Sequence, residues 1–331
     1  MHTTNTLLLT RKDVSGLLTI KECTGAVEDA FRLYAEGKTV APKVIGIHSA
    51  NGGFHIKAGL LNTGKTYFAA KANANFPGNG KAFGLPTIQG VIIVCDAENG
   101  QLLALMDSIE ITILRTGAAT AVAAKYLSVQ DAKTVTICGC GNQGRISLKA
   151  LMEVRSVKKV FAFDADKKQA DDFARHITDE LKIAAEPINT PEEGTVQSDI
   201  VVTCTPSKQP FLHSTHILPG TFIAAVGADS EEKQELYPEL LAANKTVTDI
   251  TAQCATIGEL HHAISNGHMA TDAVHAELGE IVCGKKTGRT SAQEIIVFDS
   301  TGTALQDVAA AAIVYEKALA NNIGTGLNFS A

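Results

Sequence analysis

The fold of this chain is decided by Thr134-Val135-Thr136-Ile137-Cys138-Gly139-Cys140-Gly141-Asn142-Gln143-Gly144. The β-branched half predicts a strand, which runs into G-x-G-x-x-G and then at once into a helical apolar pattern. In such an arrangement Gly139 permits a tight turn, Gly141 lets a pyrophosphate approach the backbone, and Gly144 lets the helix pack against the strand. The stretch therefore predicts a dinucleotide-binding turn with phosphates at a helix N-terminus.

The sequence downstream of this turn supports a βαβ unit and indicates the cofactor. The next strand, Val160–Phe163, ends at Asp164, about 25 positions after Gly139 and close to the ~20 typical of a ribose-binding acid. A third strand begins at Asp199. A carboxylate at Asp164 accepts hydrogen bonds from both ribose hydroxyls and repels a 2′-phosphate, so the pattern predicts NAD rather than NADP. Asp166 is a second candidate, and a solvated acidic turn is the alternative.

Composition limits the remaining possibilities. The chain has 331 residues, of which 45% are hydrophobic, enough for two domains. A net charge of −6 without a dense Lys/Arg run argues against nucleic acid and anionic membranes as partners. No apolar stretch reaches the ~18 residues of a membrane span, and Met1–Asn5 lacks a signal-peptide pattern. Seven dispersed cysteines without C-x-x-C favour free thiols over disulfides or a metal site, so we expect a soluble cytoplasmic protein.

Hydrophobic periodicity divides the chain into two kinds of region. The first part predicts helices at Ile20–Glu36 and Thr116–Tyr126, and strands at 7–9, 44–47, 54–56, 67–71, 88–95 and 102–106. The second part predicts strands near 134–138, 159–163, 199–204, 221–226, 246–250 and 294–298, followed by a terminal helix at Asp307–Asn321. We expect an α/β protein with a Rossmann-type, doubly wound parallel sheet at 119–306. Residues 1–118 with 307–331 would form a discontinuous α+β domain for substrate binding and dimerisation.

Short motifs run along the chain nearly from end to end. They are Glu28–Tyr34, Pro42–Val44, Gly84–Thr87, Leu114–Ala119, Gly139–Gln143, Val226–Asp229, Lys233–Leu236, Gly279–Ile281, Gly288–Arg289, Phe298–Gly302 and Gln306–Asp307. On these motifs the chain resembles the ornithine cyclodeaminase/μ-crystallin family, and most closely its archaeal-type alanine dehydrogenases. The motifs are specific for the family and not for the substrate.

The resemblance implies roles for individual residues. It implies catalytic roles for Asp229, Lys71 and Arg115, with Lys43 and Lys71 at the substrate carboxylate. Thr87 and Arg115 would lie beside cofactor and substrate. The residues that would line NAD are Gly139, Gly141, Asn142, Gln143, Gly144, Asp164, Thr203, Val226, Gly227, Asp229 and Lys233, with Ser300 and Thr301 at the nicotinamide end. Relatives pair through the non-nucleotide domain, so a homodimer is expected.

The chemistry of amino acid oxidation makes sense of these residue types. The substrate carboxylate needs fixed cations, which Lys supplies as a point charge and Arg as a bidentate fork. Hydride leaves Cα more easily when the amine is neutral, so a base must take the ammonium proton. Asp229 follows a predicted strand end, where open α/β sheets hold ligands, and the same carboxylate can activate water against an imine.

Each of these residues also has a simpler explanation. Lys43 and Lys71 are then solvated cations, although Lys71 interrupts an apolar strand. Asp229 is then the N-cap of the turn at Glu231–Leu236. Arg115 sits at the start of a predicted helix, where the helix dipole disfavours a cation, and this cost argues against a purely structural role.

The chain departs from the family pattern in one segment. Many relatives have Met-Pro after the second strand, and the alanine dehydrogenase pattern has an Arg two residues before that Met. Here His55 falls at the Arg position and Lys57 at the Met position. A Lys on a substrate-facing strand could hold a second carboxylate, so Lys57 is predicted to contact substrate and the substrate itself is left open.

Three functions are compatible with these residues. The first is an NAD-dependent oxidoreductase of a small amino or imino acid, with a cyclic imino acid (ketimine) reductase as a close variant. The second is an ornithine or lysine cyclodeaminase, which uses NAD catalytically and releases ammonia; Lys43 and Lys57 do not supply the acidic or polar pocket that a distal amine needs. The third is a non-catalytic binding protein like μ-crystallin, against which Lys71, Arg115 and Asp229 argue.

Overall fold

The computed structural model describes residues 5–329, in which the chain forms two compact units. One unit holds the residues up to Arg115 and those from Thr303 onward, and the other holds Thr116–Gly302. The sequence pattern predicts the two boundaries between these units at 118/119 and 306/307, within four residues of those in the structure. The expectation that the chain starts without a signal peptide concerns Met1–Asn5. Of these residues Met1–Thr4, like residues 330–331, lie outside the described part of the chain. Between residues 5 and 329 no helix combines the length and apolar character that crossing a bilayer requires.

The discontinuous unit is built on a seven-stranded sheet. Its strands are β1 (Thr6–Leu9), β2 (Lys43–Ser49), β3 (Gly52–Asn62), β4 (Thr66–Asn75), β5 (Ile88–Asp96), β6 (Leu102–Asp107) and β15 (Thr325–Leu327), in the order β15-β1-β6-β5-β4-β3-β2. The six predicted strands are present, longer than predicted in most cases, and β15 is an addition to them. One register row joins Val44, Lys57, Lys71, Ile92 and Met106 across β2–β6. Because cross-strand partners share a face, these five side chains project to the same side.

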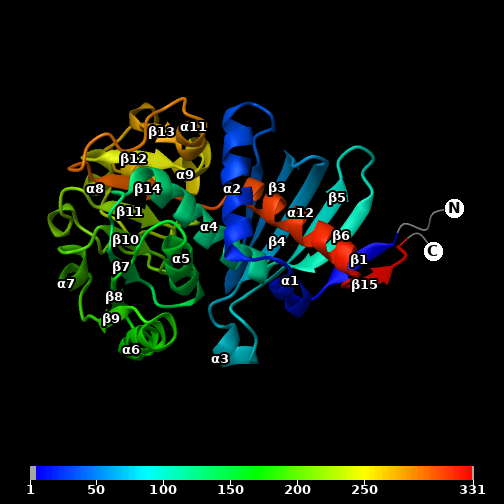
Figure 1. The fold of residues 1–331 in the computed structure, drawn as a ribbon, viewed down its shortest axis with the longest axis horizontal. Helices are drawn as coiled ribbons and strands as arrows, with labels where there is room; N and C mark the ends of the chain where they lie inside the picture. The colour runs from blue at the N-terminus through cyan, green and yellow to red at the C-terminus, as the bar shows by residue number, and fades with distance from the viewer. Residues whose placement is uncertain (1–4, 330–331) are drawn as a thin grey trace. The chain divides into compact units, whose positions relative to one another are not determined.

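Helices cover that side of the sheet. They are α1 (Arg11–Leu17), α2 (Ile20–Ala35) and α12 (Ala304–Asn321), and α12 lies along β3 and β4 beside α2 (Figure 1). Capping boxes at Thr10 and Thr19 begin α1 and α2, where each hydroxyl accepts from the N3 amide. The opposite side of the sheet carries exposed Ile45, Ile47 and Phe54. A short helix, α3 (Asn79–Phe83), stands between β4 and β5.

Two helices begin earlier than their sequence predicts. Helix α4 spans Ile109–Leu127, so Arg115 lies in its second turn and not at its start. The carboxylate of Asp107 accepts from the Ile109 amide and supplies the cap that the apolar pattern does not reveal. The helix-dipole argument for Arg115 is therefore wrong. Helix α12 begins at Ala304 behind the Thr303 cap, which puts Asp307 in its first turn.

The second unit is a parallel sheet. Its strands are β7 (Thr134–Cys138), β8 (Lys159–Phe163), β9 (Ala184–Pro187), β10 (Ile200–Thr203), β11 (Phe222–Ala225), β12 (Lys245–Thr248), β13 (Ala276–Glu277) and β14 (Ile296–Asp299). Their order is β13-β12-β14-β11-β10-β7-β8-β9. The chain winds outward from β7 through β8 and β9, then returns to β10 on the other side. This order confirms the doubly wound prediction and makes the carboxyl ends of β7 and β10 the topological switch point, where such sheets hold ligands.

Helices connect these strands (Figure 1). They are α5 (Asn142–Met152), α6 (Lys167–His176), α7 (Pro191–Thr195), α8 (Pro238–Ala242), α9 (Thr251–Ile257), α10 (Glu259–Ser265) and α11 (Leu278–Val282), with a π-helical turn at Ile177–Leu181. The six predicted strands are present, whereas the sequence does not predict β9 and β13, because they are short and contain no apolar alternation. Strands β7, β10, β11 and β14 are almost wholly buried, as a parallel sheet covered on both faces requires.

Candidate functional site

A buried group of cations lies in the discontinuous unit. The Lys71 ammonium donates to Asp307 Oδ1 at 2.8 Å, and both side chains are at most 3% exposed. Arg115 Nε lies 3.2 Å from the same oxygen, and Arg115 Nη1 donates to Gln306 Oε1 at 3.1 Å. Two cations therefore share one carboxylate, which α12 presents from its first turn to β4 and α4.

Burial and charge both act on this group. Burial, together with the charges of Arg115 and Lys57, lowers the pKa of the Lys71 ammonium to about 7, although Asp307 acts to raise it. Burial alone raises the pKa of the Asp307 carboxyl, but Lys71 and Arg115 outweigh that effect and hold the pKa below its ordinary value. Asp307 is therefore charged at neutral pH, and the proton on Lys71 is easily lost.

Three polar atoms of the group are buried without a hydrogen-bond partner among the described residues. They are Arg115 Nε, Gln306 Nε2 and Asp307 Oδ2. The Arg115 Nε contact with Asp307 is short enough for an ion pair but lacks hydrogen-bond geometry. Such atoms are costly unless a partner reaches them, and a ligand bearing a carboxylate and an amine can supply one.

The other predicted substrate residues of this unit differ in position. Lys57 is 4% exposed and directly opposite Lys71 in the register of β3 and β4. Lys43 is exposed at the start of β2 and shares a register row with Ala58 and Ala70. That row is next to the row of Lys71, so Lys43 projects to the opposite face of the sheet. Thr87 is exposed before β5. The structure thus brings Lys57, Lys71 and Arg115 together and leaves Lys43 outside the buried group.

In the second unit the glycine-rich turn has the geometry of a nucleotide-binding turn. Gly139 has φ 107°, and a Cβ there would lie 2.8 Å from the Cys204 carbonyl oxygen. A Cβ at Gly144 would lie 2.2 Å from the Gly139 carbonyl oxygen. At Gly141, by contrast, a Cβ would meet no described atom within 4 Å. Packing within the chain therefore does not explain glycine at 141, whereas the close approach of a pyrophosphate does, so the turn fits a dinucleotide.

The acid after β8 is joined to this turn. Asp164 Oδ2 accepts from the Cys140 amide at 2.8 Å, and Oδ1 accepts from the Asp166 amide at 3.0 Å. Asp166 caps α6 by accepting from the Lys168 amide. Asp164 therefore follows β8 and is hydrogen-bonded to the turn after β7, and its ribose-binding role stays a prediction, while Asp166 has a structural role as the cap of α6.

The predicted catalytic carboxylate follows β11. Asp229 Oδ1 accepts from the Lys233 ammonium at 2.6 Å, and the Asp229 side chain is 39% exposed. Residues 230–233 form a turn and no helix, so Asp229 is not an N-cap. Burial lowers the pKa of Lys233, but Asp229 more than compensates and the pKa is raised. Thr203, Val226 and Gly227 occupy the ends of β10 and β11 beside it along the same sheet edge.

A second group of buried charges consists of acids. Asp249 accepts from the Gly302 amide at 2.7 Å, the Ser300 hydroxyl at 3.1 Å and the Thr301 hydroxyl at 3.3 Å. The two predicted nicotinamide-end residues are therefore held by Asp249. Burial raises the pKa of Asp299 to about 7, and Asp299 accepts from the Leu260 amide.

Two glutamates complete this group of acids. Glu235 accepts from the amides of Thr205 and Gly227, and Glu259 accepts from the amides of Glu235 and Leu236. Burial raises the pKa of both carboxyls. Because these amides follow β10 and β11, the acids fix the loops at the carboxyl edge of the sheet.

The residues of the site that sequence patterns alone do not identify are mostly acids. Gln306 and Asp307 stand out in the sequence only as a family motif, although an Asp inside an alanine-rich apolar helix is a signal for a buried partner. Asp249 and Glu235 give no such signal, because single acids after strands are ordinary turn residues.

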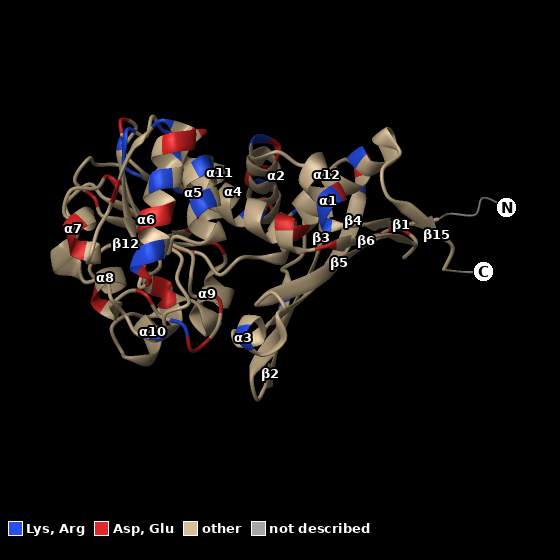
Figure 2. Ribbon diagram, turned by 90° about the horizontal axis from the view of Figure 1, so that it is seen from below, with Lys and Arg blue, Asp and Glu red and all other residues tan. Residues whose placement is uncertain are grey.

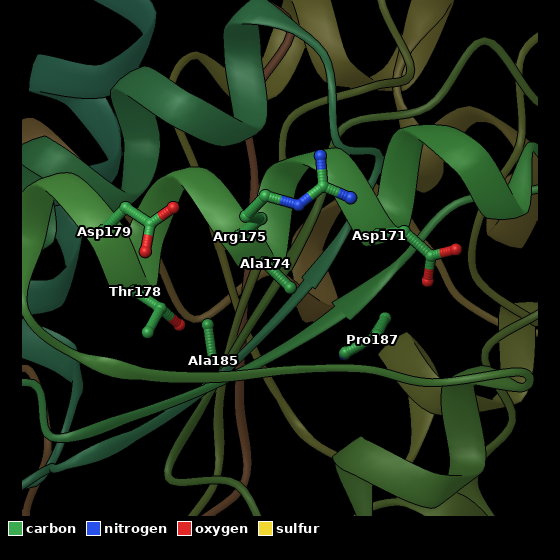
Figure 3. A pocket seen from close by; sticks show the side chains of 7 residues that line it. All are labelled: Asp171, Ala174, Arg175, Thr178, Asp179, Ala185 and Pro187. Atoms are coloured by element: carbon green, nitrogen blue, oxygen red, sulfur yellow. The ribbon is translucent and has the colours of Figure 1, made fainter.

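Two surface hollows lie away from these groups. Figure 3 shows one of about 410 Å³ on α6 and β9, lined by Asp171, Ala174, Arg175, Thr178, Asp179, Ala185 and Pro187. Another of about 450 Å³ lies between α2 and α12. Neither includes a predicted site residue. Helix α6 carries both basic and acidic side chains (Figure 2), which form the ion pairs Lys168–Asp172 and Arg175–Asp172. Among the described residues no group of acids, histidines and cysteines could hold a metal ion.

A doubly wound sheet with a glycine-rich turn, together with a unit that buries cations, defines a dinucleotide-dependent enzyme of the α/β class. The chain belongs to the ornithine cyclodeaminase/mu-crystallin family, whose model matches residues 4–322. This confirms the resemblance inferred from the motifs, and the chain is an oxidoreductase of that family.

Individual members of the family are similar over nearly their whole length. The chain is 39% identical to an alanine dehydrogenase of Archaeoglobus fulgidus, covering 98% of each chain. Among solved structures, an archaeal alanine dehydrogenase dimer with bound NAD has a TM-score of 0.94 and 39% identity, covering 98% of this chain and 99% of that one. The structure of Thermococcus litoralis Delta(1)-pyrroline-2-carboxylate reductase in complex with NADH and L-proline has a TM-score of 0.92 and 34% sequence identity. The match covers 97% of this chain and 100% of that one.

A third neighbour is a reductase of another substrate. The iminosuccinate reductase of Paracoccus denitrificans with NAD+ has a TM-score of 0.87 and 31% identity, covering 98% of this chain and 99% of that one. The cofactor predicted from the sequence, NAD, is the one that all three of these neighbours hold as NAD, NADH or NAD+.

Proposed function

We propose that this chain is an NAD-dependent oxidoreductase that acts on the CH–NH2 or C=N group of a small 2-amino or 2-imino acid. The observation that carries the proposal is the buried pair of cations, Lys71 and Arg115, on one carboxylate. A deeply buried ammonium and guanidinium are costly, and a stability role alone would favour apolar side chains of similar volume. An anionic substrate gives both cations a function.

In this proposal Lys71 and Arg115 bind the α-carboxylate of the substrate. Arg115 offers a planar fork and Lys71 a point charge, and Asp307 holds both side chains toward one place. Gln306 Nε2, buried and without a described acceptor, is a further donor for the same carboxylate. Asp307 is thus a positioning residue, because it acts through the two cations.

The cofactor would be held by the second unit. The residues proposed to line it are Gly139, Gly141, Asn142, Gln143, Gly144, Asp164, Thr203, Val226, Gly227, Asp229, Lys233 and Ser300. Thr87 and Arg115 are also proposed as cofactor-binding residues. Bound NAD supplies the acceptor for the hydride of the substrate Cα, or as NADH the donor for an imine carbon. The amides at the start of α5 would bind the pyrophosphate, and Asp164 would bind the adenosine ribose.

Proton transfer is assigned to Asp229. Its carboxylate is partly exposed and is held by Lys233, so a substrate ammonium can reach it. Taking that proton leaves the amine neutral, and its lone pair forms the C=N bond as the hydride leaves Cα. Once the carboxyl has released the proton to solvent, the carboxylate can accept a proton from the water that adds to the imine carbon. Lys233 donates to Asp229 Oδ1 at 2.6 Å and so orients the carboxylate.

A homodimer through the discontinuous unit is also proposed. The side of its sheet opposite the helices exposes Ile45 and Ile47 of β2, Phe54 of β3 and Val91 of β5. These four large apolar side chains form a surface that a second copy can cover. A cytoplasmic location is proposed because the seven cysteines are free thiols, which persist in reducing compartments.

The experiment is a net NADH assay on purified protein with alanine, ornithine, lysine, proline and aspartate, and with the matching 2-oxo acids plus ammonia. The proposal expects NADH to accumulate with an amino acid and to be consumed with an oxo acid and ammonia. A cyclodeaminase would release ammonia at constant NADH, and a binding protein would do neither. Asp229→Asn should abolish turnover while NADH still binds, as followed by its fluorescence; surviving turnover would place the base elsewhere.

A further inference from the structure

A hydrogen-bonded polar pair lies next to the buried cations of the discontinuous unit. The Ser108 hydroxyl, which is wholly buried, donates to Asn73 Oδ1 at 2.6 Å. Asn73 follows Lys71 by two positions on β4, and Ser108 immediately precedes α4, seven positions before Arg115. One strand and one helix therefore supply both the cations and the polar pair.

The polar pair is on the same side of the sheet as the cations. Residues two apart on a strand project to the same face, so Asn73 is the next position after Lys71 along that face. Seven residues of α-helix make nearly two full turns, which brings Ser108 and Arg115 to the same side of α4. Asn73 and Ser108 thus form a second level of the site, beside the level of Lys71 and Arg115.

Helix α12 covers this face of β4 only as far as Lys71. Tyr67 donates to Glu316 and Lys71 donates to Asp307, so α12 runs antiparallel to the strand. The helix begins at Ala304, three residues before Asp307, whereas β4 continues to Asn75. In keeping with this, Lys71 is 3% exposed and Asn73 is partly exposed. A small molecule bound to Lys71 can therefore reach Asn73.

The needs of the sheet do not explain the asparagine. Asparagine is depleted in strands, and an apolar side chain would fill the position without a polar partner. The cross-strand neighbour of Asn73 is Gly90. A Cβ there would overlap Asn73 Oδ1 and lie 2.5 Å from the Ala72 carbonyl oxygen and 2.7 Å from Ser108 Oγ, so glycine leaves room for the polar pair as well as for the backbone. Because Ser108 holds Oδ1, the amide turns its Nδ2 donors away from Ser108.

We propose that Asn73 is a specificity-determining residue whose Nδ2 donates to an oxygen atom on the substrate side chain, while the substrate α-carboxylate binds Lys71 and Arg115. This inference rests on the proposed function and narrows its substrate class to 2-amino or 2-imino acids with a side-chain hydroxyl or carboxylate. An oxygen acceptor satisfies the amide donors. A methyl group in its place leaves them unpaired, and a distal ammonium brings donor against donor.

Two matched pairs of substrates test the proposal. L-serine and L-2-aminobutyrate differ by a hydroxyl in place of a methyl group, and L-aspartate and L-leucine differ by a carboxylate in place of an isopropyl group of similar shape. The formation of NADH from NAD gives kcat/KM for each in the full-length protein. Wild type should prefer the oxygen-bearing member of at least one pair by about tenfold or more. The pair that shows the preference tells whether a hydroxyl or a carboxylate is recognised.

Variants then connect the preference to the amide. Asn73→Leu keeps the size of the side chain without its donors and should lower the ratio of kcat/KM within the pair by about tenfold. Asn73→Asp keeps an acceptor for Ser108 but has no Nδ2 donor, and should lower the ratio as well. Ser108→Ala releases the amide and should lower the ratio by about threefold. Asn321→Leu, at the exposed far end of α12, is the matched control and should leave the ratio unchanged.

The outcomes separate this inference from the function beneath it. A wild-type preference for the apolar member of both pairs, or an equal loss for both members in Asn73→Leu, overturns the role of Asn73 and leaves the oxidoreductase intact. Absence of NADH turnover with every amino acid and oxo acid overturns both. If Asn73→Leu does not fold, as judged by circular dichroism, the wild-type ratio and Asn73→Asp decide the question.

Discussion

The two units each bury a group of ionisable side chains, and the groups differ in kind. In the discontinuous unit Lys57, Lys71 and Arg115 gather near Asp307. In the nucleotide-binding unit the buried charges are carboxylates, Asp249, Asp299, Glu235 and Glu259. The difference lies in their partners. All but one of the side-chain oxygens of these acids accept from backbone amides or hydroxyls of the loops at the sheet edge, the exception being Asp299 Oδ1, whereas the cation group keeps three buried polar atoms without a described partner.

This contrast separates a structural use of buried charge from a catalytic one. A carboxylate that accepts from several loop amides fixes those loops, and its removal should mainly affect stability. A cation that shares one carboxylate and faces unmatched donors is prepared for a ligand, and its removal should mainly affect catalysis. The two groups can therefore be distinguished by whether a substitution moves the melting temperature or kcat/KM.

The largest expected effect is that of Lys71→Met. Removal of a desolvated cation from the proposed carboxylate site should lower kcat/KM by about 1,000-fold, within the 2–5 kcal/mol cost of such losses. The melting temperature should stay within a few degrees of wild type, because the desolvation cost of a buried ammonium is removed and Asp307 keeps Arg115 as a partner. Steady-state kinetics and calorimetry measure both quantities. Activity within about tenfold of wild type would make Lys71 a structural residue.

The opposite pattern is expected of Asp249→Ala. Gly302, Ser300 and Thr301 lose their common acceptor, which should lower the free energy of unfolding by about 3 kcal/mol and the melting temperature by at least about 6 °C. Asp249→Asn keeps part of the hydrogen bonding and should lose less. A melting temperature unchanged in Asp249→Ala would remove the structural role assigned to the acids.

A smaller effect concerns pH. Because the pKa of Lys71 is about 7, its cationic form falls about tenfold for each pH unit above that value, and KM should rise correspondingly between pH 7.5 and 9. The folded pKa lies below the unfolded one, so the unfolded chain binds more protons in this range and stability rises with pH while affinity falls. Lys71→Arg stays charged and should flatten the KM profile. A wild-type KM independent of pH would contradict this assignment.

The smallest effect is expected in the nucleotide-binding unit, at Asp164. Asp164→Ala should weaken NAD and narrow its advantage over NADP by about tenfold or less, because the carboxylate also anchors the Cys140 amide. The ratio of kcat/KM for the two cofactors measures the change. If that ratio does not move, Asp164 serves the turn alone and the cofactor is selected elsewhere.

The sequence predicts the nucleotide-binding unit better than the other. The strand, the glycine-rich turn and the acid follow one another within Thr134–Asp164, so a local sequence pattern predicts all three. The cation group depends on contacts between residues far apart, such as Lys71 with Asp307, and no local pattern encodes them. A family motif identifies Arg115, but the apolar pattern misplaces the start of its helix, since the cap at Asp107 lies in a strand end. Lys57 stands out in the sequence only as a departure from relatives, and the register of β3 and β4 gives it a neighbour.

The first turn of α12 has a consequence for how the molecule is made. Lys71 and Arg115 emerge from the ribosome long before Asp307, with the whole of Thr116–Gly302 synthesised in between. The nucleotide-binding unit can therefore be completed during translation, while the cations of the other unit must stay hydrated until the last helix arrives. A chain truncated before Thr303 would keep every residue of the glycine-rich turn and lose the anion that lets Lys71 and Arg115 be buried.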